Sequence, residues 1–143
     1  MNKQGPIIVI DDDNDDCDII NTVYANLNYQ NELLTFNEGL EALQYLKLAH
    51  IKPFIIISDI YMKEISGFEL RAMIHGDENI RIKCIPYLFF NSGNGTSQLV
   101  TTAYSMSIQG CFQKPSTHDE MRDLLTHIIE YWKRGMTPGR FKV

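Results

Sequence analysis

The 143-residue sequence has little cysteine, no long apolar run and no excess of basic residues. Its three cysteines are odd in number and widely spaced, which fits neither a disulfide framework nor a zinc site and favours a reducing compartment. No apolar run is long enough to span a bilayer, and the first ten residues lack the basic start and apolar stretch of a secretory signal. We therefore expect a cytoplasmic location and no membrane insertion.

The charge balance argues against nucleic acid as a direct partner. The chain carries 13 basic and 18 acidic residues, a net charge of −5, whereas a phosphate backbone requires a basic face. Hydrophobic residues make up 44% and charged residues 22%, which is typical of a globular protein and excludes disorder, collagen and coiled coil. The length predicts a single domain over 1–143, with a core of about 6–133 and a C-terminal tail at 134–143.

Short apolar runs alternate with segments of helical periodicity along the whole chain. The runs predict buried strands, because they are short, apolar and followed by polar or turn-forming residues. Five strands alternating with five helices predict a parallel sheet with helices on both faces. The expected strands are 7–10, 33–36, 54–57, 87–90 and 111–113. The expected helices contain apolar residues within 19–27, 40–46, 66–76, 99–103 and 121–132.

Helix starts are marked by side chains that accept hydrogen bonds from backbone N–H groups. Two pairs spaced three residues apart resemble capping boxes, in which each residue bonds the backbone of the other. The expected caps are Asp13 or Asn14, then Asn37, then Ser66 with Glu69, and last Thr117 with Glu120. In the last helix, apolar residues recur on one stripe: Met121, Leu124, Leu125, Ile128, Ile129 and Trp132.

Polar residues follow several of the predicted strands. Asp11 and Asp12 follow the first strand, Asp59 ends the third, and Ser92 and Lys114 follow the fourth and fifth. Because the carboxyl ends of parallel strands share one edge, these groups are expected to line one pocket. Clustered carboxylates repel one another, so either one is protonated or a cation lies between them. Oxygen ligands exposed to water favour Mg²⁺.

These motifs, in this order and spacing, resemble the receiver domain of two-component response regulators. Each motif alone is weak, but all four together are specific, and the resemblance covers Ile7 to about Trp132. The motifs are Val9-Ile10-Asp11-Asp12-Asp13, Ser58-Asp59-Ile60-Tyr61-Met62 with Gly67, Ser92-Gly93, and Gly110-Cys111-Phe112-Gln113-Lys114-Pro115. The resemblance implies a flavodoxin-like, doubly wound α/β fold with a five-stranded parallel sheet of order 2-1-3-4-5 and five helices.

The resemblance also implies a metal site. Asp12 is expected to bind Mg²⁺ directly and Asp11 partly through water. Asp59 is expected to contribute a carboxylate oxygen and Tyr61 its backbone carbonyl. The neighbouring Asp13, Asp15 and Asp16 are instead expected to be surface or helix-cap residues.

The phosphoryl chemistry implied by the resemblance centres on Asp59, which corresponds to the phosphoacceptor. Lys114 is expected to pair with Asp59 and later with the phosphoryl group, and the Lys114–Pro115 peptide bond is expected to be cis. Ser92 corresponds to the switch hydroxyl, although Asn91 competes for this position. Where many receivers have an aromatic residue that changes rotamer with the switch, this sequence has Cys111.

The implied partners are a histidine kinase or phosphotransfer protein and an unidentified downstream protein target. The resemblance leaves a homodimer open, since receivers often pair through the fourth and fifth elements of the fold. The chain is then a stand-alone signalling domain that assists only its own phosphorylation and dephosphorylation, and not an enzyme.

Two other functions compete with this interpretation. The chain could be a receiver-like binding module that is not phosphorylated, but the intact acidic and lysine set argues against this. It could also be a metal-dependent phosphohydrolase with Asp59 as nucleophile. Such enzymes usually need a second carboxylate just after the nucleophile, where this chain has Ile60 and Tyr61, and a cap domain, for which it has no room.

Overall fold

The computed structural model describes residues 2–138, and its strands form one parallel sheet. The sheet order is β2-β1-β3-β4-β5, which confirms the predicted order. The three inner strands are buried along their whole length and are rich in β-branched and aromatic residues. The strands are β1 (Ile7–Ile10), β2 (Leu33–Phe36), β3 (Ile55–Asp59), β4 (Tyr87–Asn91) and β5 (Gly110–Gln113).

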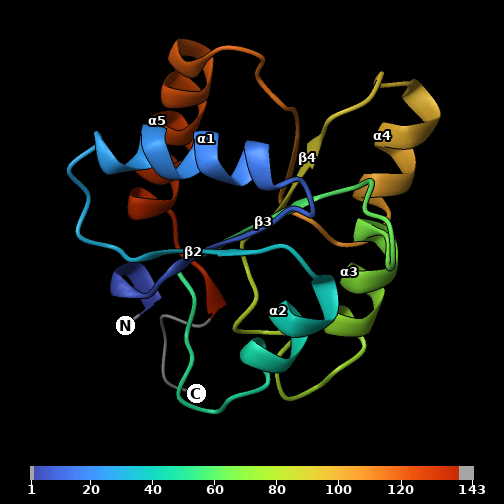
Figure 1. The fold of residues 1–143 in the computed structure, drawn as a ribbon. Coiled ribbons are helices and arrows are strands. Elements are labelled where there is room, and N and C mark those ends of the chain that lie inside the picture. Colours follow the sequence, from blue (N-terminus) through green and yellow to red (C-terminus); the bar gives the residue numbers. More distant parts are fainter. Residues whose placement is uncertain (1, 139–143) are drawn as a thin grey trace.

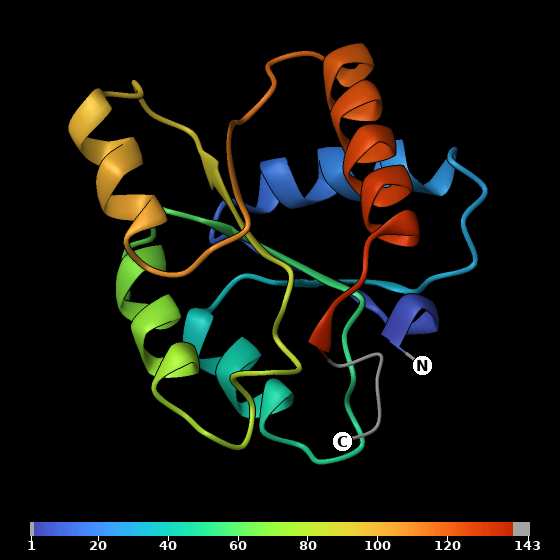
Figure 2. The same ribbon diagram turned by 180° about the vertical axis from the view of Figure 1, so that it is seen from behind.

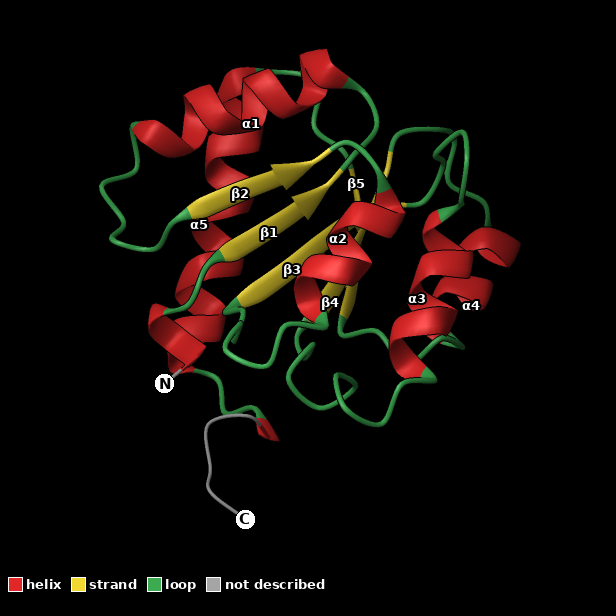
Figure 3. Ribbon diagram, turned by 60° about the horizontal axis from the view of Figure 1, so that its bottom comes forward, coloured by secondary structure: helices red, strands yellow, loops and turns green. Residues whose placement is uncertain are grey.

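Helices cover both faces of the sheet, as the alternating pattern predicts. In Figure 1, α1 (Asn14–Ala25) and α5 (His118–Arg134) lie together on one face. The other face is covered by α2 (Gly39–Leu46), α3 (Gly67–His75) and α4 (Ser97–Tyr104), which Figure 2 shows from behind. Figure 3 shows the strands running side by side between the two helical layers. A short 3-10 helix, η1 (Asn2–Gln4), precedes β1.

Three of the predicted helix caps are present. The carboxylate of Asp13 accepts hydrogen bonds from two N–H groups in the first turn of α1. Ser66 and Glu69 form the reciprocal capping box that starts α3. At α5, only half of the predicted capping box forms, since the Thr117 hydroxyl accepts a hydrogen bond from the Glu120 N–H without the return bond. These caps satisfy backbone N–H groups that have no partner inside the helix.

The second helix differs from its prediction. The residue that caps α2 is Glu38, which makes no side-chain cap hydrogen bond, so Asn37 is not the cap. The Asn37 amide instead donates to the side-chain oxygen of Asn14, 3.3 Å away. Leu40, expected on the buried stripe, is about half exposed. This helix therefore gains its stability from packing rather than from its first turn.

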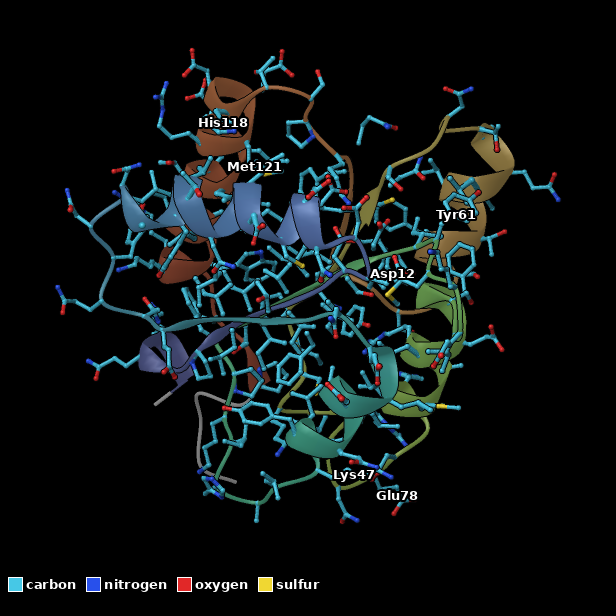
Figure 4. The ribbon with its side chains drawn as sticks, in the orientation of Figure 1. Asp12, Lys47, Tyr61, Glu78, His118 and Met121 are labelled. Carbon is cyan, nitrogen blue, oxygen red and sulfur yellow. The ribbon has the colours of Figure 1, made fainter. Side chains whose placement is uncertain are left out.

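Four of the six residues on the predicted apolar stripe of α5 are buried, and Leu124 and Trp132 are partly buried against them. Met121, Leu125, Ile128 and Ile129 pack between the helix and the sheet. Figure 4 labels Met121 on the side of α5 that faces α1. A second apolar cluster on the opposite face joins α2, α3 and α4 to the sheet, and the sheet is thereby fixed from both sides.

Several features bear on the predicted compartment and tail. No helix within residues 2–138 is long and apolar enough to cross a membrane. The thiols of Cys17, Cys84 and Cys111 are all free. Of the predicted C-terminal tail, 134–143, the first residue belongs to α5, and residues 139–143 lie outside the described part of the chain.

Candidate functional site

Polar side chains meet at the carboxyl ends of the three central strands and β5. The chain leaves β1 at Asp11 and Asp12, ends β3 at Asp59 and leaves β5 at Lys114. Asp11 is 2% exposed and Asp59 4% exposed, although both are acidic. In Figure 4, Asp12 and Tyr61 lie on the side of the molecule where β1 and β3 end. The site therefore lies where parallel sheets bind ligands.

The ammonium group of Lys114 lies at the centre of this site. Its Nζ atom is 2.6 Å from Asp11 Oδ2 and 3.1 Å from Asp59 Oδ2. A third carboxylate, that of Asp16 on α1, lies 2.9 Å from the same nitrogen. An ammonium group has three N–H donors, and three carboxylates accept from this one. The sequence prediction placed Asp16 on the surface or at a cap and missed this contact.

One ammonium cannot neutralise three carboxylates, and two of the three are also buried. Burial raises the pKa of Asp59 and of Asp11 above the ordinary value, and the hydrogen bonds and charge of Lys114 only partly offset this. Burial would lower the pKa of Lys114, but the hydrogen bonds with Asp11 and Asp16 raise it overall. The site therefore carries excess negative charge and would accept a further cation.

Backbone contacts fix the orientation of Asp59. The Ile60 N–H donates to Asp59 Oδ1 at 2.8 Å, and a backbone hydrogen bond from Tyr61 also lowers the Asp59 pKa. The loop after β3 is closed by the Gly67 N–H, which donates to the Ile60 carbonyl at 2.7 Å. This glycine packs directly against the backbone of Asp59 and Ile60, where there is no room for a side chain.

Gly67→Ala is expected to destabilise the protein by about 3 kcal/mol, because overpacking of a closed contact forces the backbone to shift. A Cβ atom at Gly67 would lie 2.8 Å from the Ile60 Cα and even closer to the Asp59 carbonyl oxygen. Gly95→Ala is the matched control, because a Cβ atom there meets side-chain atoms no closer than 3.6 Å. Urea unfolding of both variants would measure the difference, and equal stabilities would contradict the tight contact.

The side chains of Asn91 and Ser92, the two candidates for the switch position, make different contacts. The Ser92 hydroxyl lies 3.4 Å from both carboxylate oxygens of Asp59. The Asn91 amide points elsewhere, donating to the Gly93 carbonyl at 2.9 Å and to the Gln113 side chain at 3.2 Å. The Asn91 carbonyl accepts from the Lys114 N–H at 2.9 Å. Of the two candidates for the switch position, Ser92 is thus the one beside Asp59.

The other predicted metal ligands lie near the acidic pair. Asp12 is half-buried, and its Oδ2 accepts a hydrogen bond from the Lys63 N–H at 2.8 Å. The Tyr61 side chain is 56% exposed, and the predicted contribution of this residue is its backbone carbonyl. Within residues 2–138 no three His, Cys, Asp or Glu side chains are arranged as a metal-binding group. The Lys114 ammonium lies between Asp11 and Asp59 and contacts both carboxylates.

The donor set nevertheless fits a hard divalent cation. Asp11, Asp12 and Asp59 offer only carboxylate oxygens, which Mg²⁺ and Mn²⁺ prefer. Two of the three are buried with raised pKa values, so a cation that held them ionised would relieve their repulsion. No sulfur or imidazole ligand is part of this set.

Two further predictions concern the neighbours of Lys114, namely the peptide bond that follows it and the residue three positions before it. Among the described residues, the cis peptide bond is Ile85–Pro86. Lys114–Pro115 is therefore trans, and the prediction of a cis bond there is wrong. A trans bond is the preferred form of an X–Pro peptide, and the Lys114 N–H keeps its bond to β4 in this form. Cys111, in place of the usual aromatic residue, is partly buried against the apolar cluster under α4.

A comparison with protein families identifies the class. Residues 7–126 match the response regulator receiver domain family, so the chain belongs to this family. A receiver domain is a phosphoacceptor signalling module rather than a catalytic enzyme. The match spans all five strands and the region from Asp11 to Lys114.

Individual relatives agree with this assignment. The probable methanogenesis regulatory protein FilR2 of Methanothrix harundinacea is 23% identical over 88% of this chain and 82% of its own length. The phosphorylated cyanobacterial phytochrome response regulator RcpA has a TM-score of 0.81, 21% identity, and coverage of 94% of this chain and 99% of its own. The Mn²⁺-bound response regulator Rcp1 has a TM-score of 0.79, 18% identity, and coverage of 94% and 99%. These structures share the flavodoxin-like receiver fold.

Proposed function

We propose that this chain is a stand-alone response regulator receiver that accepts a phosphoryl group on Asp59 from a histidine kinase or a phosphotransfer protein. One observation carries the proposal: a buried lysine ammonium bridges the carboxylates that end β1 and β3. Burying two carboxylates beside one ammonium is costly, and clusters of buried ionisable groups are typical of functional sites. Membership of the receiver family supports the same conclusion.

In the proposed reaction, a carboxylate oxygen of Asp59 attacks the phosphorus of a phosphohistidine. An O–P bond forms, the P–N bond breaks, and the imidazole leaves with the electron pair. Asp59 is held in one orientation by the Ile60 N–H, which lowers the entropic cost of attack. The Lys114 ammonium lies 3.1 Å from Asp59 Oδ2, so it is close enough to contact a phosphoryl group transferred to Asp59. Phosphoryl transfer needs mainly position and charge neutralisation.

The proposed metal ligands are the carboxylates of Asp11, Asp12 and Asp59 and the backbone carbonyl of Tyr61. When bound there, Mg²⁺ would supply charge neutralisation for the incoming phosphoryl oxygens. The response regulator Rcp1 is known in a Mn²⁺-bound form, which supports a divalent cation in this chain as well. Lys114 then balances the carboxylate charge that the metal leaves uncompensated.

We assign the switch to Ser92. Its hydroxyl is already 3.4 Å from Asp59, so a small movement of the β4–α4 loop would bring it to a phosphoryl oxygen. Phosphorylation adds charge and acceptor oxygens that favour this movement. A shift of the loop and α4 would change the surface offered to a downstream protein target. Homodimer formation through this surface is a further outcome of the same switch.

The three free thiols support a reducing compartment, and we propose a cytoplasmic location. The acidic net charge argues against direct action on nucleic acid. The alternative is a receiver-like binding module that is not phosphorylated.

The test is incubation of the purified protein with acetyl phosphate, with and without Mg²⁺, followed by intact-mass measurement. We expect one added phosphoryl group that requires Mg²⁺, since the uncompensated carboxylates would otherwise repel the donor. Beryllofluoride binding serves as the second readout, because it does not depend on the donor. No adduct and no beryllofluoride binding would overturn the proposal in favour of the unphosphorylated module.

A further inference from the structure

Of the three carboxylates that contact the Lys114 ammonium, that of Asp16 belongs to a helix and the other two lie at strand ends. Its carboxylate lies 2.9 Å from the Lys114 Nζ and is 31% exposed, while the lysine side chain is 8% exposed. Asp16 stands in the first turn of α1, and its N–H donates to the capping carboxylate of Asp13 at 3.2 Å. The helix cap therefore fixes the backbone from which Asp16 reaches Lys114.

The three partners of Lys114 differ in what else they must do. Asp59 is the proposed acceptor and Asp11 a proposed metal ligand. Carboxylate oxygens of both would therefore be engaged by the metal or the phosphoryl group. Asp16 has neither task. Its carboxylate accepts from Lys114 through Oδ2 and from no other side chain among residues 2–138. It can hold the ammonium while the other two carboxylates are engaged.

We propose that Asp16 is a positioning residue that anchors Lys114 in the pocket when the oxygens of Asp11 and Asp59 turn to the metal and the phosphoryl group. The proposal rests on the proposed function of Asp59 as acceptor. Without Asp16, the ammonium would be held only by Asp11, Asp59 and the phosphoryl oxygens, the same groups that the metal engages. The transferred phosphoryl group would then lose the fixed alignment of its cation.

Neighbouring Asp15 provides a matched control. It stands in the same first turn, its N–H is bonded to the same Asp13 carboxylate at 2.9 Å, and its side chain is exposed. Asp15→Asn and Asp16→Asn remove the same charge at nearly the same place. Simple electrostatics predicts that both variants take up an anionic donor slightly faster, because a repulsive charge is gone. Anchoring predicts the opposite change, and only for Asp16→Asn.

The experiment measures the acetyl phosphate dependence of adduct formation at saturating Mg²⁺, and beryllofluoride affinity, for the wild type, both Asn variants and Asp16→Glu. We expect the maximal rate of Asp16→Asn to fall about fivefold, the scale of one charged hydrogen bond at a half-exposed site, with a matching loss of beryllofluoride affinity. Asp15→Asn should equal or slightly exceed the wild type, and Asp16→Glu should recover part of the rate because it restores a carboxylate.

The outcomes separate the two proposals. Equal rates for Asp15→Asn and Asp16→Asn, with normal adduct formation by the wild type, would overturn the anchoring role of Asp16 alone. Absence of any adduct on the wild type would overturn the proposed function and this role with it. Thermal unfolding of each variant identifies loss of fold, and Asp16→Glu keeps the test decisive if Asp16→Asn is unstable.

Discussion

Asp59→Asn is expected to abolish the Mg²⁺-dependent phosphoryl adduct and to leave the fold intact. The amide has nearly the same shape as the carboxylate, and its oxygen can still accept the hydrogen bond from the Ile60 N–H. It lacks the anionic oxygen that attacks phosphorus, so the rate should fall below detection. Intact-mass measurement after incubation with acetyl phosphate checks this.

The stability of Asp59→Asn gives an independent readout. Burial raises the folded-state pKa of Asp59 above its unfolded value, so the protonated form is favoured in the native protein. The contribution of this group to stability is therefore present at low pH and is lost as pH rises through the folded pKa. Without this titration, the variant should lose less stability than the wild type between pH 4 and neutral pH, as measured by urea unfolding without metal.

Asp18→Asn is the matched control for both measurements, because Asp18 is an exposed residue of α1. It should keep the adduct and the pH dependence of the wild type. An adduct of wild-type mass and rate on Asp59→Asn would show that another residue is the acceptor.

The fold is largely predictable from the sequence because the local spacing of apolar residues indicates which positions are buried. The run Ile7–Ile10 is apolar at every position, as a strand covered on both faces requires. The stripe of α5 is equally direct, since the apolar spacing matches one helix face. Leu40 shows the limit: the spacing places it on the stripe of α2, but the buried face of this short helix is formed by Gly39, Ala42, Leu43 and Leu46, and Leu40 lies outside it.

The candidate site is only partly predictable, because a motif gives the position of a residue and not the direction of its side chain. The acidic run after β1 contains six carboxylates in eight residues, and the sequence does not reveal which of them turns inward. Asp16 does so because the Asp13 cap starts α1 where its first turn faces Lys114. The trans form of the Lys114–Pro115 bond was also not predictable, because the sequence pattern does not determine the isomer and the family resemblance gives it only by analogy.

Lys114→Met is expected to be the most destabilising change at this site. The substitution keeps a long side chain but leaves Asp11 and Asp59 buried without a cation. Removing one partner of a buried ion pair costs about 3–5 kcal/mol, because the remaining charge is uncompensated. Urea unfolding at pH 7 without metal should show this loss. Lys63→Met is the control, because the Lys63 side chain is exposed and only its backbone contacts the site.

The pH dependence distinguishes a lost charge pair from lost packing. Burial already raises the pKa of both carboxyl groups, and loss of the lysine removes the charge that opposes this effect. The folded variant then takes up protons at a pH where the unfolded chain is still ionised, so its stability rises as pH falls. The difference from the wild type should therefore shrink between pH 7 and pH 5. Addition of Asp59→Asn to Lys114→Met should recover part of the stability at pH 7, since one buried charge is removed. A deficit that is constant with pH and unaffected by the second substitution would mean that Lys114 stabilises the site by packing and not by its charge.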